Sequence, residues 1–179
     1  MTLLKSIAFM LHIILSTQNL SNLRKLDLSG HLIASSLAGF NRQLEKLGHA
    51  TNLRELIIEG CQVNHTEFLK SLHLLCVLNL SITKITEEDL QYIAHCASLK
   101  YLYLSFNPLS EQSILDTVVC LPNLEHLDIF GINLSIEGLY ALLQTSLKSL
   151  HCSLPRVTGH INVIALARQF GVKITISDL

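Results

Sequence analysis

The histidines and cysteines of this chain are the side chains best suited to bind a metal or to carry out acid–base and nucleophilic chemistry. The 179 residues include nine histidines and five cysteines. No HxxxH, HExxH or CxxC spacing groups them as a zinc site requires. The sequence also lacks a G-x-S-x-G motif, a phosphate-binding glycine loop and a signature of paired carboxylates. We therefore expect no enzyme activity, no metal and no cofactor, and we expect the histidines at positions 49, 65, 73 and 95 to face solvent beside helices.

Asp128 and His151 form the one pair whose residue types and predicted placement could support acid–base chemistry. The two residues occupy equivalent positions in successive copies of the repeat described below. That repeat places them side by side on neighbouring strands, about 4.8 Å apart. Because no nucleophile accompanies them, we favour a surface ion pair or hydrogen bond over an acid–base site.

The cysteines bear on the cellular compartment. Their number is odd, they are spread along the chain, and none of them is close to another in sequence. This pattern predicts free thiols rather than a disulfide framework, and it favours an intracellular location. Cys152 falls on an inward strand position, where we expect a buried and unreactive thiol.

Composition and charge indicate which kinds of partner the chain could bind. Hydrophobic residues make up 49% of the chain and charged residues 15%, whereas about 25% charged residues is typical. Much of the chain must therefore be buried or must offer apolar surface to a partner. The net charge of −1 provides no basic field that would attract a nucleic acid.

A repeated pattern dominates the sequence. The motif L-x-x-L-x-L recurs with Leu102 and Leu104 among its members, and its fourth and sixth residues point to the same face of a strand. Parallel strands need a crossover between them, usually a helix. We therefore predict a single domain over residues 1–179 with about seven strands. The copies begin near Leu23, Leu53, Leu75, Leu99, Leu124, Leu147 and Gly171.

The repeat resembles that of the leucine-rich-repeat family, whose longer motif is L-x-x-L-x-L-x-x-N/C-x-L. The fourth copy matches this motif with Asn107 and Leu109, and the second matches with Cys61 and Val63. The resemblance implies an α/β solenoid, or horseshoe, with a parallel concave sheet and a helical convex side. The ninth motif position of the other copies departs from the pattern, so we expect few side-chain bonds between turns and an irregular curvature. Those residues are His31, Thr83, Ile132 and Pro155.

Repeats of this length with helical backs are most similar to the ribonuclease-inhibitor-like and cysteine-containing, F-box-type subclasses. The stretches Ile85–Leu90 and His95–Leu99 are closest to the cysteine-containing type. This likeness implies, as one alternative, the substrate-recognition subunit of a ubiquitin-ligase complex. A secreted or pathogen-derived recognition protein is a second alternative.

Several crossovers have helical patterns. We predict helices over residues 34–48 and 90–97, the second preceded by a capping arrangement of Thr86 and Asp89. Further helices should begin at the N-cap residues Ser110, Ser135 and Thr158 and end near 119, 143 and 169. Residues 1–20 are expected to form an N-terminal helix or cap, although the apolar run from 7 to 15 also has features of a signal peptide. That run is too short to span a membrane, which requires about 20 apolar residues.

The third, fifth and seventh motif positions point away from the core, onto the concave sheet. Their centre is apolar and aromatic, whereas their ends carry Lys25, Asp27, Glu55, Glu59 and Lys173. This arrangement is typical of a protein interface, and tyrosine is frequent among binding hot spots. Too few basic residues surround the tyrosines for RNA binding. We predict a protein partner, and membership of a larger complex is one form this binding could take. The residues predicted to bind the partner are Ile57, Val77, Tyr101, Tyr103, Phe106, His126, Asp128, Phe130 and His151.

Overall fold

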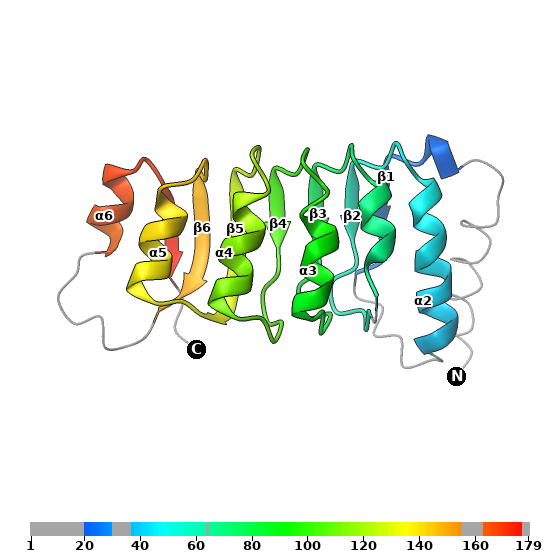
Figure 1. Ribbon diagram of the computed structural model, residues 1–179, viewed down its shortest axis with the longest axis horizontal. Coiled ribbons are helices and arrows are strands. Elements are labelled where there is room, and N and C mark those ends of the chain that lie inside the picture. The colour runs from blue at the N-terminus through cyan, green and yellow to red at the C-terminus, as the bar shows by residue number, and fades with distance from the viewer. Residues whose placement is uncertain (1–19, 30–36, 64, 155–162, 177–179) are drawn as a thin grey trace.

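Seven parallel strands form one sheet, and their order in space is their order in the sequence. The computed structural model describes residues 20–29, 37–63, 65–154 and 163–176. Each leucine at the fourth motif position pairs with its counterpart on the next strand, for example Leu78 with Leu102 and Leu102 with Leu127. The seven-stranded parallel sheet predicted from the repeat is thus confirmed (Figure 1). The strands are β1 Lys25–Asp27, β2 Glu55–Ile57, β3 Val77–Asn79, β4 Tyr101–Tyr103, β5 His126–Asn133, β6 Ser149–Ser153 and β7 Lys173–Ile176.

The crossovers are helical and lie in a row along one side of the sheet (Figure 1). Neighbouring helices contact one another, as α3 does α4 and α4 does α5. The opposite side, which we call the open face, carries the third, fifth and seventh motif positions. The helical segments are η1 Leu20–Asn22, α2 Leu37–Glu45, η2 Lys46–His49, η3 Glu67–Ser71, α3 Glu87–Ile93, α4 Glu111–Val119, α5 Ile136–Leu143 and α6 Val163–Gln169.

The predicted helices are present, with corrected bounds. Ser110 and Ser135 are N-caps as expected, since their hydroxyls accept hydrogen bonds from the backbone N–H groups of Ser113 and Gly138. The helix predicted over 90–97 instead spans Glu87–Ile93, because Thr86 is its N-cap. The first crossover is split into α2 and the 3-10 helix η2. The expected N-terminal helix or cap and the Thr158 cap lie outside the described residues, except for Leu20.

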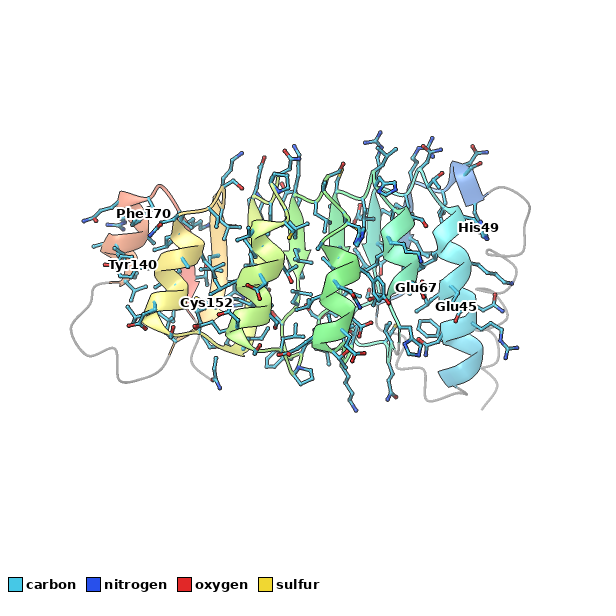
Figure 2. The ribbon with its side chains drawn as sticks, in the orientation of Figure 1. Glu45, His49, Glu67, Tyr140, Cys152 and Phe170 are labelled. Atoms are coloured by element: carbon cyan, nitrogen blue, oxygen red, sulfur yellow. The ribbon has the colours of Figure 1, made fainter. Side chains whose placement is uncertain are left out.

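The motif leucines form a continuous core between the strands and the helices. Leu56, Leu78 and Leu102 are fully buried, and Leu104 is only 1% exposed. Buried side chains of the strands and of the helices belong to one cluster, and Figure 2 shows both layers with their side chains drawn. Within the described residues, no helix is both long and apolar enough to cross a lipid bilayer.

The ninth motif position links neighbouring turns more often than the sequence predicted. The amide of Asn107 donates hydrogen bonds to the backbone oxygens of Leu80 (2.8 Å) and Leu104 (2.9 Å). The Cys61 thiol donates to the carbonyl of Leu28 across a repeat boundary at 3.4 Å. The backbone N–H and the hydroxyl of Thr83 donate to Oδ1 of Asn107 in the next copy, both at 3.3 Å. The second and fourth copies thus supply bonds as their match to the motif implies, and Thr83 adds a link that its departure from the motif did not predict, because threonine also carries a donor.

Candidate functional site

The parallel register aligns the predicted site residues in columns across the open face. Tyr101 is paired with His126 and Tyr103 with Asp128, on β4 and β5. His151 continues the second column on β6, next to Asp128. Ile57 and Val77 lie on β2 and β3, in the part of the face nearer to the N-terminus. The half-buried members are Ile57, Val77, Tyr101, Tyr103, His126, Asp128, Phe130 and His151, while Phe106 is exposed.

Aromatic rings stack in pairs along β4, β5 and β6. The rings of Tyr101 and His126 are parallel, with centroids 4.3 Å apart. Phe130 stacks on His151 at 5.1 Å, and Phe106 meets Phe130 edge-to-face at 5.0 Å. Such contacts contribute about 0.5–1.5 kcal/mol each beyond the burial of their area. The rings are therefore held in fixed orientations before any partner binds.

Asp128 accepts hydrogen bonds beside the stacked pair of Phe130 and His151. Its Oδ1 accepts from the backbone N–H of Phe130 at 3.1 Å and from the hydroxyl of Ser105. The same oxygen lies 3.1 Å from Nδ1 of His151, which confirms the predicted Asp128–His151 contact. Here the carboxylate lies between the hydroxyl and the imidazole. A catalytic triad needs the imidazole between the other two groups, so this arrangement does not activate Ser105 as a nucleophile.

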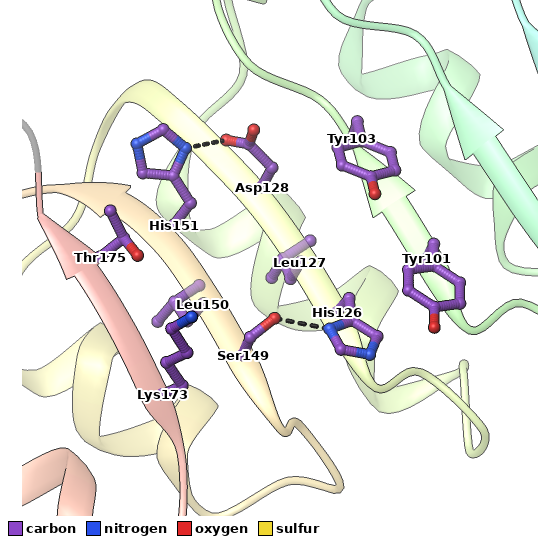
Figure 3. A pocket seen from close by; sticks show the side chains of 10 residues that line it. All are labelled: Tyr101, Tyr103, His126, Leu127, Asp128, Ser149, Leu150, His151, Lys173 and Thr175. Atoms are coloured by element: carbon purple, nitrogen blue, oxygen red, sulfur yellow. Dashed lines mark hydrogen bonds and ion pairs between the residues drawn. The ribbon is translucent and has the colours of Figure 1, made fainter.

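A shallow hollow of about 330 Å³ opens between these columns (Figure 3). The hydroxyl of Ser149 lies 2.6 Å from Nδ1 of His126 at its lower edge. Burial raises the pKa of Tyr103, and the nearby Tyr101 and Asp128 raise it further, so its hydroxyl keeps its proton at neutral pH. The residues lining the hollow are Tyr101, Tyr103, His126, Leu127, Asp128, Ser149, Leu150, His151, Lys173 and Thr175.

Charged residues lie at both ends of the open face. Lys25 forms an ion pair with Glu55 at 2.7 Å, and the hydrogen bond that its ammonium group donates to this carboxylate raises the pKa of Lys25. At the other end, Lys173 is exposed on β7 beside the hollow. The predicted charged rim is thus present, with its N-terminal lysine paired and its C-terminal lysine next to the aromatic centre.

The eighth motif position carries a feature that the sequence analysis missed. Four described residues at this position have left-handed backbone, with φ of 73° at Gly60, 58° at Ile82, 57° at Phe106 and 82° at Gly131. The side chains of Ile82 and Phe106 are 50% and 51% exposed. Aligning the copies would have marked this position, because glycine occupies it at 30, 60 and 131 and a large apolar residue stands there at 82, 106 and 154.

Gly131 is required for a second reason. A Cβ added there would lie 2.8 Å from Cδ1 of Phe106. The absent side chain therefore leaves space for the Phe106 ring, which meets Phe130 edge-to-face. The glycine of one repeat thus helps to fix an exposed aromatic side chain of the preceding repeat.

The other described histidines and the cysteines lie outside this face or below it. The four histidines predicted at the surface of the helical side are exposed, and His49 is seen at the end of η2 (Figure 2). No group of three potential metal ligands occurs within the described ranges. Cys61, Cys96 and Cys152 are buried free thiols whose pKa values burial raises to about 11, about 12 and about 12. Such thiols stay protonated at neutral pH and are poor nucleophiles.

Comparison with known proteins supports the fold. The sequence model of the Leucine Rich Repeat family matches residues 98–120, which include the fourth copy of the motif. A search of curated protein sequences gives no significant match. Among solved structures, an internalin from Listeria monocytogenes is similar with a TM-score of 0.58 and 19% sequence identity over 97% of this chain. The match spans 64% of the internalin chain. Together these results identify a leucine-rich-repeat fold, but they support neither of the two subclasses expected from the repeat.

Proposed function

We propose that this chain is a non-catalytic protein-interaction module and that its open face binds the partner. The observation that supports this most is the ordered aromatic cluster of Tyr101, His126, Phe106, Phe130 and His151, which lies on the uncovered side of a parallel sheet. Leucine-rich-repeat domains are typically interaction modules, and stacked repeats provide extended binding surfaces. The open face, with this cluster at its centre and charged residues at its ends, has the anatomy of a protein interface.

The rigidity of the cluster favours binding. Association is costly when side chains must be immobilised, by about 0.5–1.5 kcal/mol for each flexible side chain. Tyr101 and Phe130 are already stacked on histidines of the next strand. Aromatic side chains of this kind provide a large contact area and lose little conformational entropy when they bind.

Truncation of Tyr103 tests this proposal. Affinity capture with the wild-type chain first identifies a partner, and calorimetric titration then compares Tyr103→Ala with the wild type. We expect binding to weaken by more than about 1 kcal/mol, as at a hot spot. Circular dichroism and thermal unfolding should change little, because Tyr103 is only partly buried and lies outside the core.

Gln91→Ala is the matched control, since Gln91 is exposed on α3 at the helical side. This variant should bind the partner like the wild type. Normal binding by Tyr103→Ala together with failure of Gln91→Ala would assign the function to the helices and reject the proposal.

Two narrower functions remain as alternatives. The likeness of residues 85–99 to cysteine-containing repeats supports a role as the substrate-recognition subunit of a ubiquitin ligase. For this role to hold, affinity capture must recover cullin or adaptor proteins. A secreted or pathogen-derived recognition protein requires that the mature chain be found outside the cell that makes it. We favour an intracellular location, because three buried free thiols suit a reducing compartment.

A further inference from the structure

The hollow on the open face offers more hydrogen-bond donors than acceptors. Among the described residues that line it, Asp128 is the only carboxylate, and this group already accepts from Ser105, Phe130 and His151. The ammonium group of Lys173 and the hydroxyls of Tyr101 and Tyr103 have no hydrogen-bond or ion-pair partner among the described residues. Figure 3 shows Lys173 and the two tyrosines on opposite sides of the hollow. An anionic group is therefore the chemical complement of this site.

An apolar patch lies further along the same strands. Phe130 follows His126 by four residues in β5. The ring of Phe130 is contacted by Phe106, which lies in the turn after β4, and by His151 on β6. A strand rises by about 3.3 Å per residue, so the patch lies about 13 Å from the His126 edge of the hollow. An extended segment lying along the strands covers that distance with about four residues.

We propose that the open face binds an extended peptide segment of the partner, with an acidic side chain in the hollow and an aromatic or large aliphatic side chain on the patch of Phe106, Phe130 and His151. The two anchoring residues of the segment lie about four positions apart. This inference rests on the proposed function and specifies the chemistry of the partner. The acidic residue of the segment supplies the charge complement of Lys173, and its aromatic or aliphatic residue buries exposed aromatic surface.

Synthetic ten-residue peptides with a Ser/Gly background test this pairing without knowledge of the natural partner. One peptide carries Glu and Phe four positions apart, a second replaces Glu by Lys, and a third places Glu and Phe two positions apart. Fluorescence anisotropy with the full chain at low ionic strength measures each affinity. We expect the first peptide to bind about tenfold more tightly than either of the others, and we expect added salt to weaken its binding.

Lys173→Glu should reverse the charge preference, so that the Lys peptide binds more tightly than the Glu peptide. The matched control is Lys70→Glu, which makes the same charge change at an exposed position of η3 on the helical side. This control should keep the wild-type preference. A difference confined to Lys173→Glu would assign the effect to the hollow rather than to net charge.

The inference is wrong if none of the peptides binds at millimolar concentration, if Lys and Glu peptides bind equally, or if the two lysine variants behave alike. In each of these cases the Tyr103→Ala titration with the captured partner still decides the proposed function separately. A partner that depends on Tyr103 but not on Lys173 would leave the open face as the binding site and remove only the acidic anchor.

Discussion

Two backbone angles at the eighth motif position, directly after the strands, reduce local stability. Ile82 and Phe106 adopt φ values of 58° and 57°, a region that suits glycine and is costly for branched or bulky residues. Strain of this kind typically costs about 1–3 kcal/mol per residue and is common at functional sites. Both side chains are also exposed, so burial in the core does not offset the cost. Binding of a partner to these two side chains would explain why large apolar residues stand at strained and exposed positions.

Two substitutions at Phe106 separate backbone strain from side-chain packing. Phe106→Ala and Phe106→Gly both remove the contact with Phe130, but only glycine relieves the left-handed backbone. We expect Phe106→Gly to be more stable than Phe106→Ala by about 1 kcal/mol. Urea unfolding of the two variants measures the difference. If the alanine variant were equally stable or more stable, the left-handed conformation at this position would be refuted.

Residue pairs on the open face were predictable from sequence where the repeat fixes them. The contact between Asp128 and His151 follows from equal motif positions on adjacent parallel strands, because the register brings such residues together. The stacking of Tyr101 on His126 did not follow, because ring orientation depends on rotamers that the neighbouring side chains select. The left-handed backbone at Ile82 did not follow either, because the family motif leaves its eighth position unspecified.

At the scale of single elements, carboxylates that accept hydrogen bonds connect the N-termini of successive crossovers. Asp89 of α3 accepts from the backbone N–H of Thr86 (2.9 Å) and from that of Thr66 (3.0 Å), which precedes η3. Glu111 of α4 likewise accepts from the hydroxyl of Ser135, the N-cap of α5, at 2.8 Å. The sequence identified the caps themselves. It could not show that these acidic residues also satisfy donors of a neighbouring repeat.

Asp89→Ala tests the importance of this connection. Asp89 is 4% exposed and Thr66 is fully buried. Removing the carboxylate leaves the Thr66 backbone N–H and hydroxyl without the Oδ1 acceptor. We expect a loss of about 3 kcal/mol in the free energy of unfolding, since unsatisfied buried donors are costly. Glu88→Ala, one residue earlier and exposed, should change stability by less than about 0.5 kcal/mol. Similar losses for both variants would show that the buried carboxylate has no special role.

The α3 helix also shows why element bounds are harder to predict than element types. The pattern of Thr86 and Asp89 was recognised as a capping arrangement, but the helix was placed after Asp89 instead of after Thr86. Asp89 is the third helical residue, where its side chain reaches back to the cap. Strands β1 to β4 are each three residues long and pair in register, because a slip by one residue would turn their buried leucines out of the core.

At the scale of the whole molecule, the stacked repeats make stability a sum of contributions from each repeat and its neighbours. The central strands β3, β4 and β5 have neighbours on both sides, and their fourth-position leucines are at most 2% exposed. In β7, which has one neighbouring strand, the two isoleucines are half-buried or exposed. Local opening should therefore be easiest in this part of the described sheet.

Native-state hydrogen exchange measures this gradient directly. The Leu104 amide donates to the Asp128 carbonyl and the Lys173 amide donates to the Lys148 carbonyl, both at 2.8 Å. Because the two bonds are equally short, any difference in protection reports the surroundings of each strand and not the geometry of the bond. After correction for intrinsic rates, we expect the Leu104 amide to exchange at least about tenfold more slowly than the Lys173 amide, since regions with few buried contacts open without global unfolding. Equal protection at the two positions would mean that the repeats open only together, as a single cooperative unit, and that each central strand gains no extra stability from its second neighbour.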